Sequence, residues 1–293
     1  MSGQGSSLRA TIGDDMQVGN PTQEDFQKLN DLCTGLEEIS PVMVAYSGGV
    51  DSSFLALVAH EALDSGARIV TAVSPSLART DLERARRIAE HFGFRYQEVQ
   101  TREMERPDYV ANGPDRCYHC KTELFEFMDT LLSLDEGACL CYGAIPEDQG
   151  DHRPGARAAA ERKVLAPLAE VGLTKPAIRR LSRHLGLETW SLPSQACLAS
   201  RIAYHTPVTT EKLEAVDLGE EFLKGLGFET CRVRHHERIA RIEVPPERLV
   251  ELLEHREAVS RRMRELGFIY VTCDLMGLRS GSMNESLKLR VVP

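Results

Sequence analysis

Apolar residues from about residue 21 to residue 206 alternate between helical spacing and short continuous runs. Over residues 22–39 a phenylalanine and three leucines recur every three or four positions, which predicts an amphipathic helix with Thr22 as its N-cap. The run 42–46 is apolar, follows Pro41 and precedes two glycines, so it predicts a buried strand. The same pattern predicts strands at 67–73, 94–99 and 138–142, and helices at 54–63, 80–91, 120–132 and 174–185, with Thr80 and Thr174 as caps. This order is typical of a doubly wound parallel α/β sheet.

The pattern changes after residue 206. Helices are predicted at 209–226 and 247–266, and strands at 228–234, 239–244 and 268–274. That order fits a smaller α+β domain with an antiparallel pair of strands. Three polar segments, 102–116, 147–155 and 191–206, are predicted loops, and the last is expected to be an active-site loop. We therefore divide the chain into a mobile, polar N-terminal segment (1–20), an α/β domain (21–206) and a C-terminal α+β domain (207–293).

The turn between the strand 42–46 and the next helix reads Ser47-Gly48-Gly49-Val50-Asp51-Ser52. A glycine-rich turn before a helix presents unpaired backbone N–H groups, and the helix dipole adds positive potential, so the turn suits a phosphate. It is not a Walker loop, which needs a Lys-Ser or Lys-Thr pair where Val50-Asp51 stands here. An aspartate there would repel phosphate unless it binds Mg²⁺ or holds the N–H groups of its own loop.

This hexapeptide resembles, at every position, the signature of the PP-loop ATP pyrophosphatases, which cleave ATP between its α- and β-phosphates. The resemblance implies an adenine nucleotide alpha hydrolase-like fold for residues 21–206, ATP and Mg²⁺ as ligands, and a catalytic role for Asp51. The residues that it implies for ATP binding are Ser47, Gly48, Gly49, Val50, Asp51, Ser52 and Ser53. An ordinary glycine-rich βα turn is the alternative interpretation.

Composition narrows the class of protein. The chain has 293 residues, 42% of them hydrophobic, which is enough for a real core and for about two domains. No apolar run approaches the ~20 residues of a membrane span, so we expect a soluble cytoplasmic protein. The net charge of −9 argues against a nucleic-acid partner, because phosphate backbones dominate such binding. In that setting the 8 cysteines are expected to be reduced thiols, metal ligands or catalytic groups.

Cys117 and Cys120 form a Cys-x-x-Cys pair at the start of a predicted helix, and Cys197 lies in the predicted active-site loop. Three thiolates can hold a [4Fe–4S] cluster and leave its fourth iron open for another ligand. With His119 as a fourth ligand they could instead hold Zn²⁺. Buried reduced thiols are the remaining interpretation, and it is the one that we apply to the other cysteines of the chain.

Several segments that occur in a fixed order along the chain together resemble the LarE family, the sulfur transferases of nickel-pincer nucleotide synthesis. They are the glycine-rich loop and residues 116–121, 151–155, 197–201, 232–236, 240–243 and 279–285. The resemblance covers nearly everything after residue 25. The loop is shared by many families, whereas the later segments are far more specific.

The resemblance implies that the substrate is pyridinium-3,5-biscarboxylic acid mononucleotide, that ATP adenylates a carboxylate of it, and that sulfur replaces one oxygen. An acyl adenylate is a good electrophile, so a sulfur nucleophile can expel AMP from it. Members with a single cysteine, at the position of Cys197, give up its sulfur and keep dehydroalanine. Members that also have the pair are associated with a [4Fe–4S] cluster that carries an extra sulfide. Because this chain has all three cysteines, we expect it to hold the cluster and to take sulfur from sulfide or another donor. The resemblance also implies a homo-hexamer.

Ser200, Arg201, Arg232 and Arg234 match family positions that hold the substrate phosphate. Arg232 and Arg234 are two residues apart on a predicted strand, so their side chains share a face. The alternative to phosphate binding is that this face is a solvated basic surface. Glu243 matches a position linked to metal binding, with an ordinary surface carboxylate as the alternative. The family usually has the segment Gly-x-Asn-x-Asp-Asp at the position of residues 143–148. In this chain the segment lacks the asparagine.

Two other functions compete with this one. Some PP-loop tRNA thiolases also use three cysteines and a cluster, but the acidic charge and the lack of a recognisable RNA-binding module count against them. A non-catalytic nucleotide- or metal-binding module is the third possibility, which would bind ATP without releasing pyrophosphate.

Overall fold

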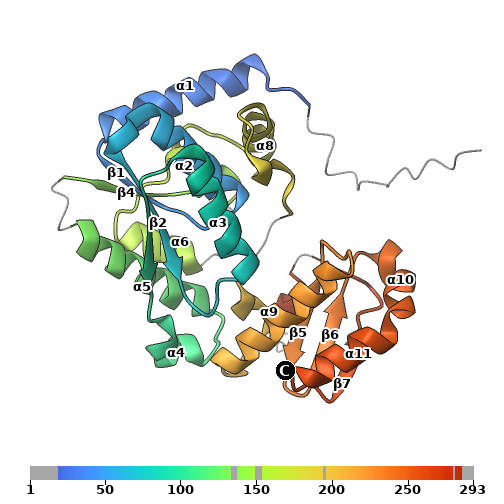
Figure 1. Cartoon of the computed structure of the whole chain (residues 1–293). Coiled ribbons are helices and arrows are strands. Elements are labelled where there is room, and N and C mark those ends of the chain that lie inside the picture. The colour runs from blue at the N-terminus through green and yellow to red at the C-terminus, as the bar shows by residue number, and fades with distance from the viewer. Residues whose placement is uncertain (1–18, 133–136, 149–153, 194–195, 280, 286–293) are drawn as a thin grey trace, which may run out of the picture.

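The computed structural model describes residues 19–132, 137–148, 154–193, 196–279 and 281–285. The predicted mobile segment is therefore described only at its last two positions, and residues 151–153 of one family segment lie outside the described part. Figure 1 shows two bodies, one built around the strands β1 to β4 and the other around β5 to β7.

The first body has a four-stranded parallel sheet in the order β3-β2-β1-β4. Its strands are β1 (Val42–Ala45), β2 (Ala67–Val73), β3 (Tyr96–Gln100) and β4 (Cys139–Tyr142). Strand β1 is central, and its Val42 aligns with Ala67 on one side and Cys139 on the other. All four strands were expected from the sequence, within two residues at each end.

Helices cover both faces of this sheet, which confirms the predicted doubly wound α/β fold (Figure 1). One face packs against α1 (Gln23–Glu38), α2 (Val50–Leu63), α3 (Arg79–Phe92) and α8 (Lys175–His184). The other packs against α5 (Arg116–Leu132) and α6 (Pro154–Glu161). Successive residues of β1 serve opposite cores, with Met43 on the α5 side and Val44 on the α2 side.

The second body is a three-stranded sheet with helices against it. Strands β5 (Arg232–His236) and β6 (Ile239–Glu243) are antiparallel, and β7 (Tyr270–Cys273) is parallel to β6. Its core also includes apolar residues of α9 (Thr210–Gly225), α10 (Leu249–Glu254) and α11 (Arg256–Glu265). The expected antiparallel pair is confirmed, while the division of the chain after residue 206 stays a prediction.

A small apolar cluster joins the two bodies. Tyr109, Leu198, Ala199 and Val208 pack there with Leu213 of α9. Short elements complete the described structure: α4 (Pro107–Val110), α7 (Pro167–Glu170), η2 (Asp64–Gly66), η3 (Glu103–Glu105), η4 (Pro146–Asp148), η5 (Glu188–Ser191), η6 (Leu198–Arg201), η7 (Pro246–Arg248) and η8 (Ser282–Asn284). Within the described ranges no helix has the length and apolar character needed to cross a bilayer.

Several predicted boundaries are wrong. Helix α2 begins at Val50 instead of 54, so the second half of the glycine-rich motif lies in its first turn. Helix α5 begins at Arg116 instead of 120, so the Cys-x-x-Cys pair lies inside the helix, at its start. The predicted loop 147–155 runs into α6, whose alanines favour a helix that starts at Pro154. The predicted helix 247–266 is two helices, because the chain leaves helical geometry at His255. Thr80 lies inside α3, and Ala78 is at the N-cap position.

Candidate active site

The turn after β1 is held by its own serines. Ser52 Oγ accepts a hydrogen bond from the backbone N–H of Ser47 at 3.2 Å, and the hydroxyls of the two serines lie 3.0 Å apart. Gly48 has a left-handed φ of 71°, and a Cβ there would lie 3.1 Å from both Ala85 Cβ and Asp81 O of α3. Glycine is therefore required at position 48 by conformation and by space. Gly49 has the extended conformation of an N-cap, so its expected role, close approach of a phosphate, stays a prediction.

Asp51 lies in the first turn of α2 and is paired with a lysine from a distant helix. Lys175 Nζ lies 2.6 Å from Asp51 Oδ2, across 124 residues of sequence. Burial raises the pKa of Asp51, and the charge of Lys175 opposes that rise. Asp51 Oδ1 is buried and has no hydrogen-bond partner in the described residues. An unsatisfied carboxylate oxygen beside this glycine-rich turn is a suitable ligand for Mg²⁺, so the residues present fit the implied metal ion.

Sequence reasoning missed Lys175 and the residue that supports it. Glu147 Oε1 accepts the backbone N–H of Lys175 at 2.9 Å, so Glu147 caps α8 where the hydroxyl of Thr174 does not. The segment 143–148 also packs on the turn, because a Cβ at Gly143 would lie 2.9 Å from the backbone N of Ser52. A lysine as the first residue of a helix opposes the helix dipole, and that was the available signal.

The three candidate cysteines lie in one electrostatic neighbourhood. Cys117 and Cys120 are in the first turn of α5, and Cys197 precedes η6. Cys117 and Cys197 are exposed, whereas burial raises the pKa of Cys120, with further increases from the charges of Cys197 and Cys117. Cys120 also packs against the apolar cluster that contains Leu198 and Ala199. Thiols are the donors that iron–sulfur clusters use, so these residue types fit the implied cluster, while its presence stays a prediction.

The described side chains do not form a site for a single metal ion. Within the described ranges no three His, Cys, Asp or Glu side chains are grouped closely enough to hold one. The iron–sulfur and zinc interpretations therefore both stay predictions. His119, the suggested fourth zinc ligand, instead has its Nε2 3.2 Å from Asp115 Oδ2.

Two buried polar side chains attach the Cys197 segment to the rest of the site. Arg116, just before Cys117, donates to the carbonyl of Ala199 at 2.9 Å and to Asn112 Oδ1. Asn112 is fully buried, and its amide donates to the carbonyls of Ala203 at 2.9 Å and Thr206 at 3.0 Å. Neither residue was identified from the sequence, because each acts through carbonyls that are remote along the chain.

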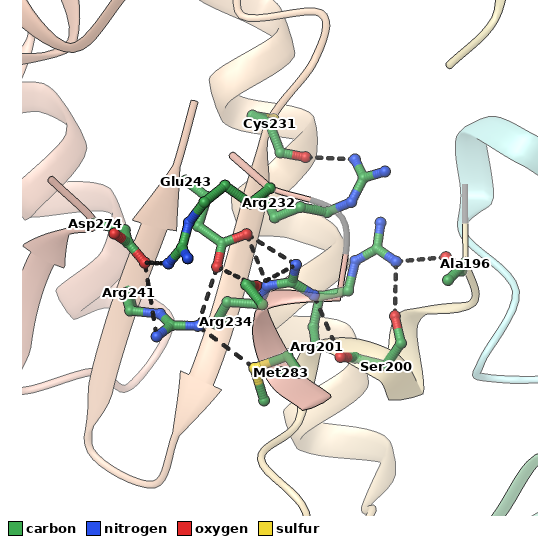
Figure 2. Close-up of polar contacts among 12 residues, drawn as sticks. Ala196, Ser200, Arg201, Cys231, Arg232, Arg234, Arg241, Glu243, Asp274 and Met283 are labelled. Carbon is green, nitrogen blue, oxygen red and sulfur yellow. Dashed lines mark hydrogen bonds and ion pairs between the residues drawn. The ribbon is translucent and has the colours of Figure 1, made fainter. Parts of the chain in front are cut away.

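The four predicted phosphate ligands lie together, as Figure 2 shows for Ser200, Arg201, Arg232 and Arg234. Arg201 is 2% exposed, donates to Glu220 Oε1 at 2.9 Å and contacts Ser200 Oγ at 3.0 Å. Arg234 donates to Glu243 Oε2 at 2.8 Å and to the Ser200 carbonyl at 3.3 Å. The solvated-surface alternative is wrong, since all three arginines are buried.

Arg232 differs electrostatically from its two neighbours. It donates to the Cys231 carbonyl at 2.6 Å. Burial lowers the pKa of Arg232, and the positive charges of Arg201 and Arg234 lower it further. A phosphate placed among these groups would relieve that crowding of positive charge.

Glu243 is not a surface carboxylate. It is 0% exposed, and its oxygens accept from Arg234, Arg241 at 3.0 Å and Ser282 at 2.9 Å (Figure 2). A metal ion at Glu243 would have to displace these donors, so its metal role stays a prediction. A separate cavity of about 870 Å³ lies among α10, α11 and β7, and none of the predicted site residues lines it.

Comparison with known proteins places these features in a family. The family model described as asparagine synthase matches residues 36–132. The chain is 35% identical over 260 residues to pyridinium-3,5-bisthiocarboxylic acid mononucleotide synthase of Lactiplantibacillus plantarum, covering 87% of this chain and 93% of that protein. It is 40% identical over 262 residues to an uncharacterized protein of Synechocystis, covering 89% of this chain and 98% of that protein. An uncharacterized protein of Methanocaldococcus jannaschii is 25% identical over 258 residues, with 87% and 98% covered.

Proposed function

Since the chain belongs to the LarE family and is an ATP-using enzyme of the PP-loop type, we propose that it adenylates a carboxylate of pyridinium-3,5-biscarboxylic acid mononucleotide and converts it to a thiocarboxylate. The observation that carries this proposal is the position of the segment after Cys197. Its Leu198 N–H donates to Ser76 O at 2.9 Å, just beyond β2, and its Ser200 carbonyl accepts from Arg234. One short segment thus joins a candidate thiol to the chain just beyond the carboxyl end of β2 and to the arginines.

The chemistry assigns a role to each group of residues. The N–H groups of the turn at 47–49 bind phosphates, and Asp51 binds Mg²⁺. A carboxylate oxygen of the substrate forms a bond to the α-phosphorus of ATP, and pyrophosphate leaves with the electron pair of the broken bond. Sulfur then adds to the acyl carbon and AMP leaves. The arginines, with Ser200, hold the substrate phosphate and so fix the carboxylate in position.

Cys117, Cys120 and Cys197 are the residues that would hold a [4Fe–4S] cluster. When bound, such a cluster supplies a sulfide that can be transferred without the loss of a side chain. Arg116 supplies a buried positive charge beside two of the three candidate ligands, since the charges of Cys197 and Cys117 raise the pKa of Arg116. Transfer of the Cys197 sulfur itself is the competing route, and it leaves dehydroalanine at that position.

The test is anaerobic incubation of the protein with Mg²⁺, ATP, sulfide and either the mononucleotide or bulk tRNA. Mass spectrometry of both acceptors should show exchange of oxygen for sulfur in the mononucleotide only. Sulfur found only in tRNA would overturn the proposal, and ATP binding without pyrophosphate release would indicate a non-catalytic module.

Cysteine variants then separate the two sulfur routes. Iron analysis after anaerobic reconstitution should show cluster iron in the wild type and its loss in Cys117→Ala, Cys120→Ala and Cys197→Ala. Cys33→Ala is the matched control, since Cys33 packs in α1 away from the site. Dehydroalanine at position 197 in a peptide map, with wild-type turnover in Cys117→Ala, would contradict the cluster. The cytoplasmic location and the homo-hexamer belong to the same proposal.

A further inference from the structure

Lys175 places a positive charge at the glycine-rich turn from outside the motif. It is the first residue of α8, and its Nζ is 2.6 Å from Asp51 Oδ2 in the first turn of α2. Its side chain is 24% exposed, so most of its length is covered by protein. The N-terminal ends of α2 and α8 therefore meet at this ion pair.

The placement of Lys175 is unfavourable for α8 alone. A cation at a helix N-terminus opposes the helix dipole. The backbone N–H of Lys175 already has an acceptor in Glu147 Oε1, so the helix end does not depend on the lysine side chain. The Lys175 ammonium instead lies against Asp51, a carboxylate whose side chain is only 23% exposed.

The carboxylate of Asp51 is only half satisfied by this pair. Its Oδ2 accepts from Lys175, while the buried Oδ1 has no partner in the described residues. A buried acceptor without a partner is costly, and native structures retain one where a ligand satisfies it. The pair thus has one oxygen oriented for a metal ion and one cation that a bound phosphate would attract.

We propose that Lys175 is a phosphate-contacting residue of the ATP site. Without nucleotide its ammonium neutralises Asp51, and when Mg–ATP binds the ammonium moves to the β- and γ-phosphates. Mg²⁺ then takes its place beside Asp51. This proposal rests on the proposed function only in requiring that ATP is split between its α- and β-phosphates.

The role follows from the charges of the reaction. As the bond from the α-phosphorus to the bridging oxygen breaks, the electron pair passes to pyrophosphate, and negative charge grows on the leaving group. A fixed ammonium beside those oxygens stabilises that charge without transferring a proton or an electron. Because the flexible four-carbon stem of lysine carries a compact charge, the ammonium can shift between carboxylate and phosphate.

Calorimetric binding of Mg–ATP to the full chain tests this proposal directly. Lys175→Met should raise the Kd for Mg–ATP about tenfold to a hundredfold, the range for loss of one charge-assisted contact. Lys175→Arg should keep most of the affinity, because its charge can still reach phosphate. Lys28→Met is the matched control, because Lys28 forms an i,i+4 ion pair with Glu24 on α1. The Kd of this variant for Mg–ATP should equal that of the wild type.

A purely structural role predicts a different pattern. If Lys175 only balanced Asp51, Lys175→Met would melt at a lower temperature but bind Mg–ATP within about twofold of the wild type at saturating Mg²⁺, and that result would overturn the proposal. Lys175→Gln replaces Lys175→Met if the latter does not fold. The binding assay needs no acceptor, so a failed thiolation assay with intact ATP binding removes only the substrate assignment. A wild type that does not bind ATP removes both.

Discussion

The guanidinium of Arg116 donates a hydrogen bond of 2.9 Å to the carbonyl of Ala199. This bond joins the first turn of α5, which carries Cys117 and Cys120, to the segment directly after Cys197. Arg116 is 5% exposed, so the bond is formed away from competing water. The relative position of the three thiols therefore depends on one buried side chain that is not itself a thiol.

Replacing Arg116 should disturb the thiols before it disturbs the rest of the fold. Arg116→Met leaves Asn112 Oδ1 without this donor, and the Ala199 carbonyl keeps only the N–H of Ile202, so we expect a loss of about 1–3 kcal/mol of unfolding free energy. The amount of iron bound after anaerobic reconstitution should fall strongly, whereas the melting temperature should fall only slightly. Arg157→Met is the control, because Arg157 lies over the Tyr118 ring on the exposed side of the same helix pair. Equal iron contents in the two variants would contradict this assignment.

Gly48 can be tested against a second glycine of the same conformation. Gly48 and Gly93 have φ values of 71° and 72°, but a Cβ has no neighbour within 4 Å at Gly93 and meets α3 at 3.1 Å at Gly48. Gly93→Ala should cost about 1–2 kcal/mol of unfolding free energy from the backbone alone. Gly48→Ala should cost more and should also weaken Mg–ATP binding. Denaturant unfolding of both variants measures the difference, and equal losses would show that α3 yields to the added methyl group.

The sequence predicts the central features of the first body for a physical reason. Strand β1 and its turn lie in the buried centre of the sheet, where a continuous apolar run followed by two glycines has few other solutions. The alternation of Arg232 and Arg234 likewise follows from the period of a strand. These are local rules that operate within a few residues.

The contacts that complete the site are not local. Lys175 meets Asp51 across 124 residues, and Arg116 meets Ala199 across 83. The carboxylate Glu220 that neutralises Arg201 comes from α9, where its helical position gives no sign of burial. Each pairing depends on how two elements approach each other, which apolar spacing does not determine.

Stability should depend on the protonation of His235. His235 is 7% exposed, and burial, together with the charges of Lys212 and His236, lowers its pKa from 6.5 to about 4. Between these pH values the unfolded chain binds the proton and the folded chain does not, so stability increases with pH across this window. The contribution is complete above about pH 6.5 and decreases by at most about 3 kcal/mol as the pH falls to 4.

A variant isolates that contribution. His235→Phe keeps a ring beside Phe268, 5.0 Å away between centroids, but cannot be protonated. Its unfolding free energy should therefore decrease less than that of the wild type between pH 6.5 and 4. His91→Gln, at an exposed position, should follow the wild type. Parallel pH curves for the wild type and His235→Phe would show that another group is responsible.

Arg232 and Arg234 should separate in their effects on stability and binding. Arg234→Met removes a donor from the fully buried Glu243, which retains Arg241 and Ser282, so we expect a loss of about 2–3 kcal/mol of unfolding free energy. Arg232→Met removes a charge whose pKa is already lowered by burial and by two positive neighbours. Its unfolding free energy should therefore change by less than about 1 kcal/mol.

Binding should show the opposite order. Arg232→Met should weaken binding of the mononucleotide about tenfold to a hundredfold, because a phosphate would lose one charge-assisted contact at the place where positive charges are crowded. Urea unfolding and calorimetric titration with the mononucleotide measure the two quantities on the same samples. Arg238→Met, in the exposed turn between β5 and β6, should change neither. If Arg232→Met binds as well as this control, the substrate phosphate lies elsewhere; if it unfolds as easily as Arg234→Met, Arg232 supports the fold.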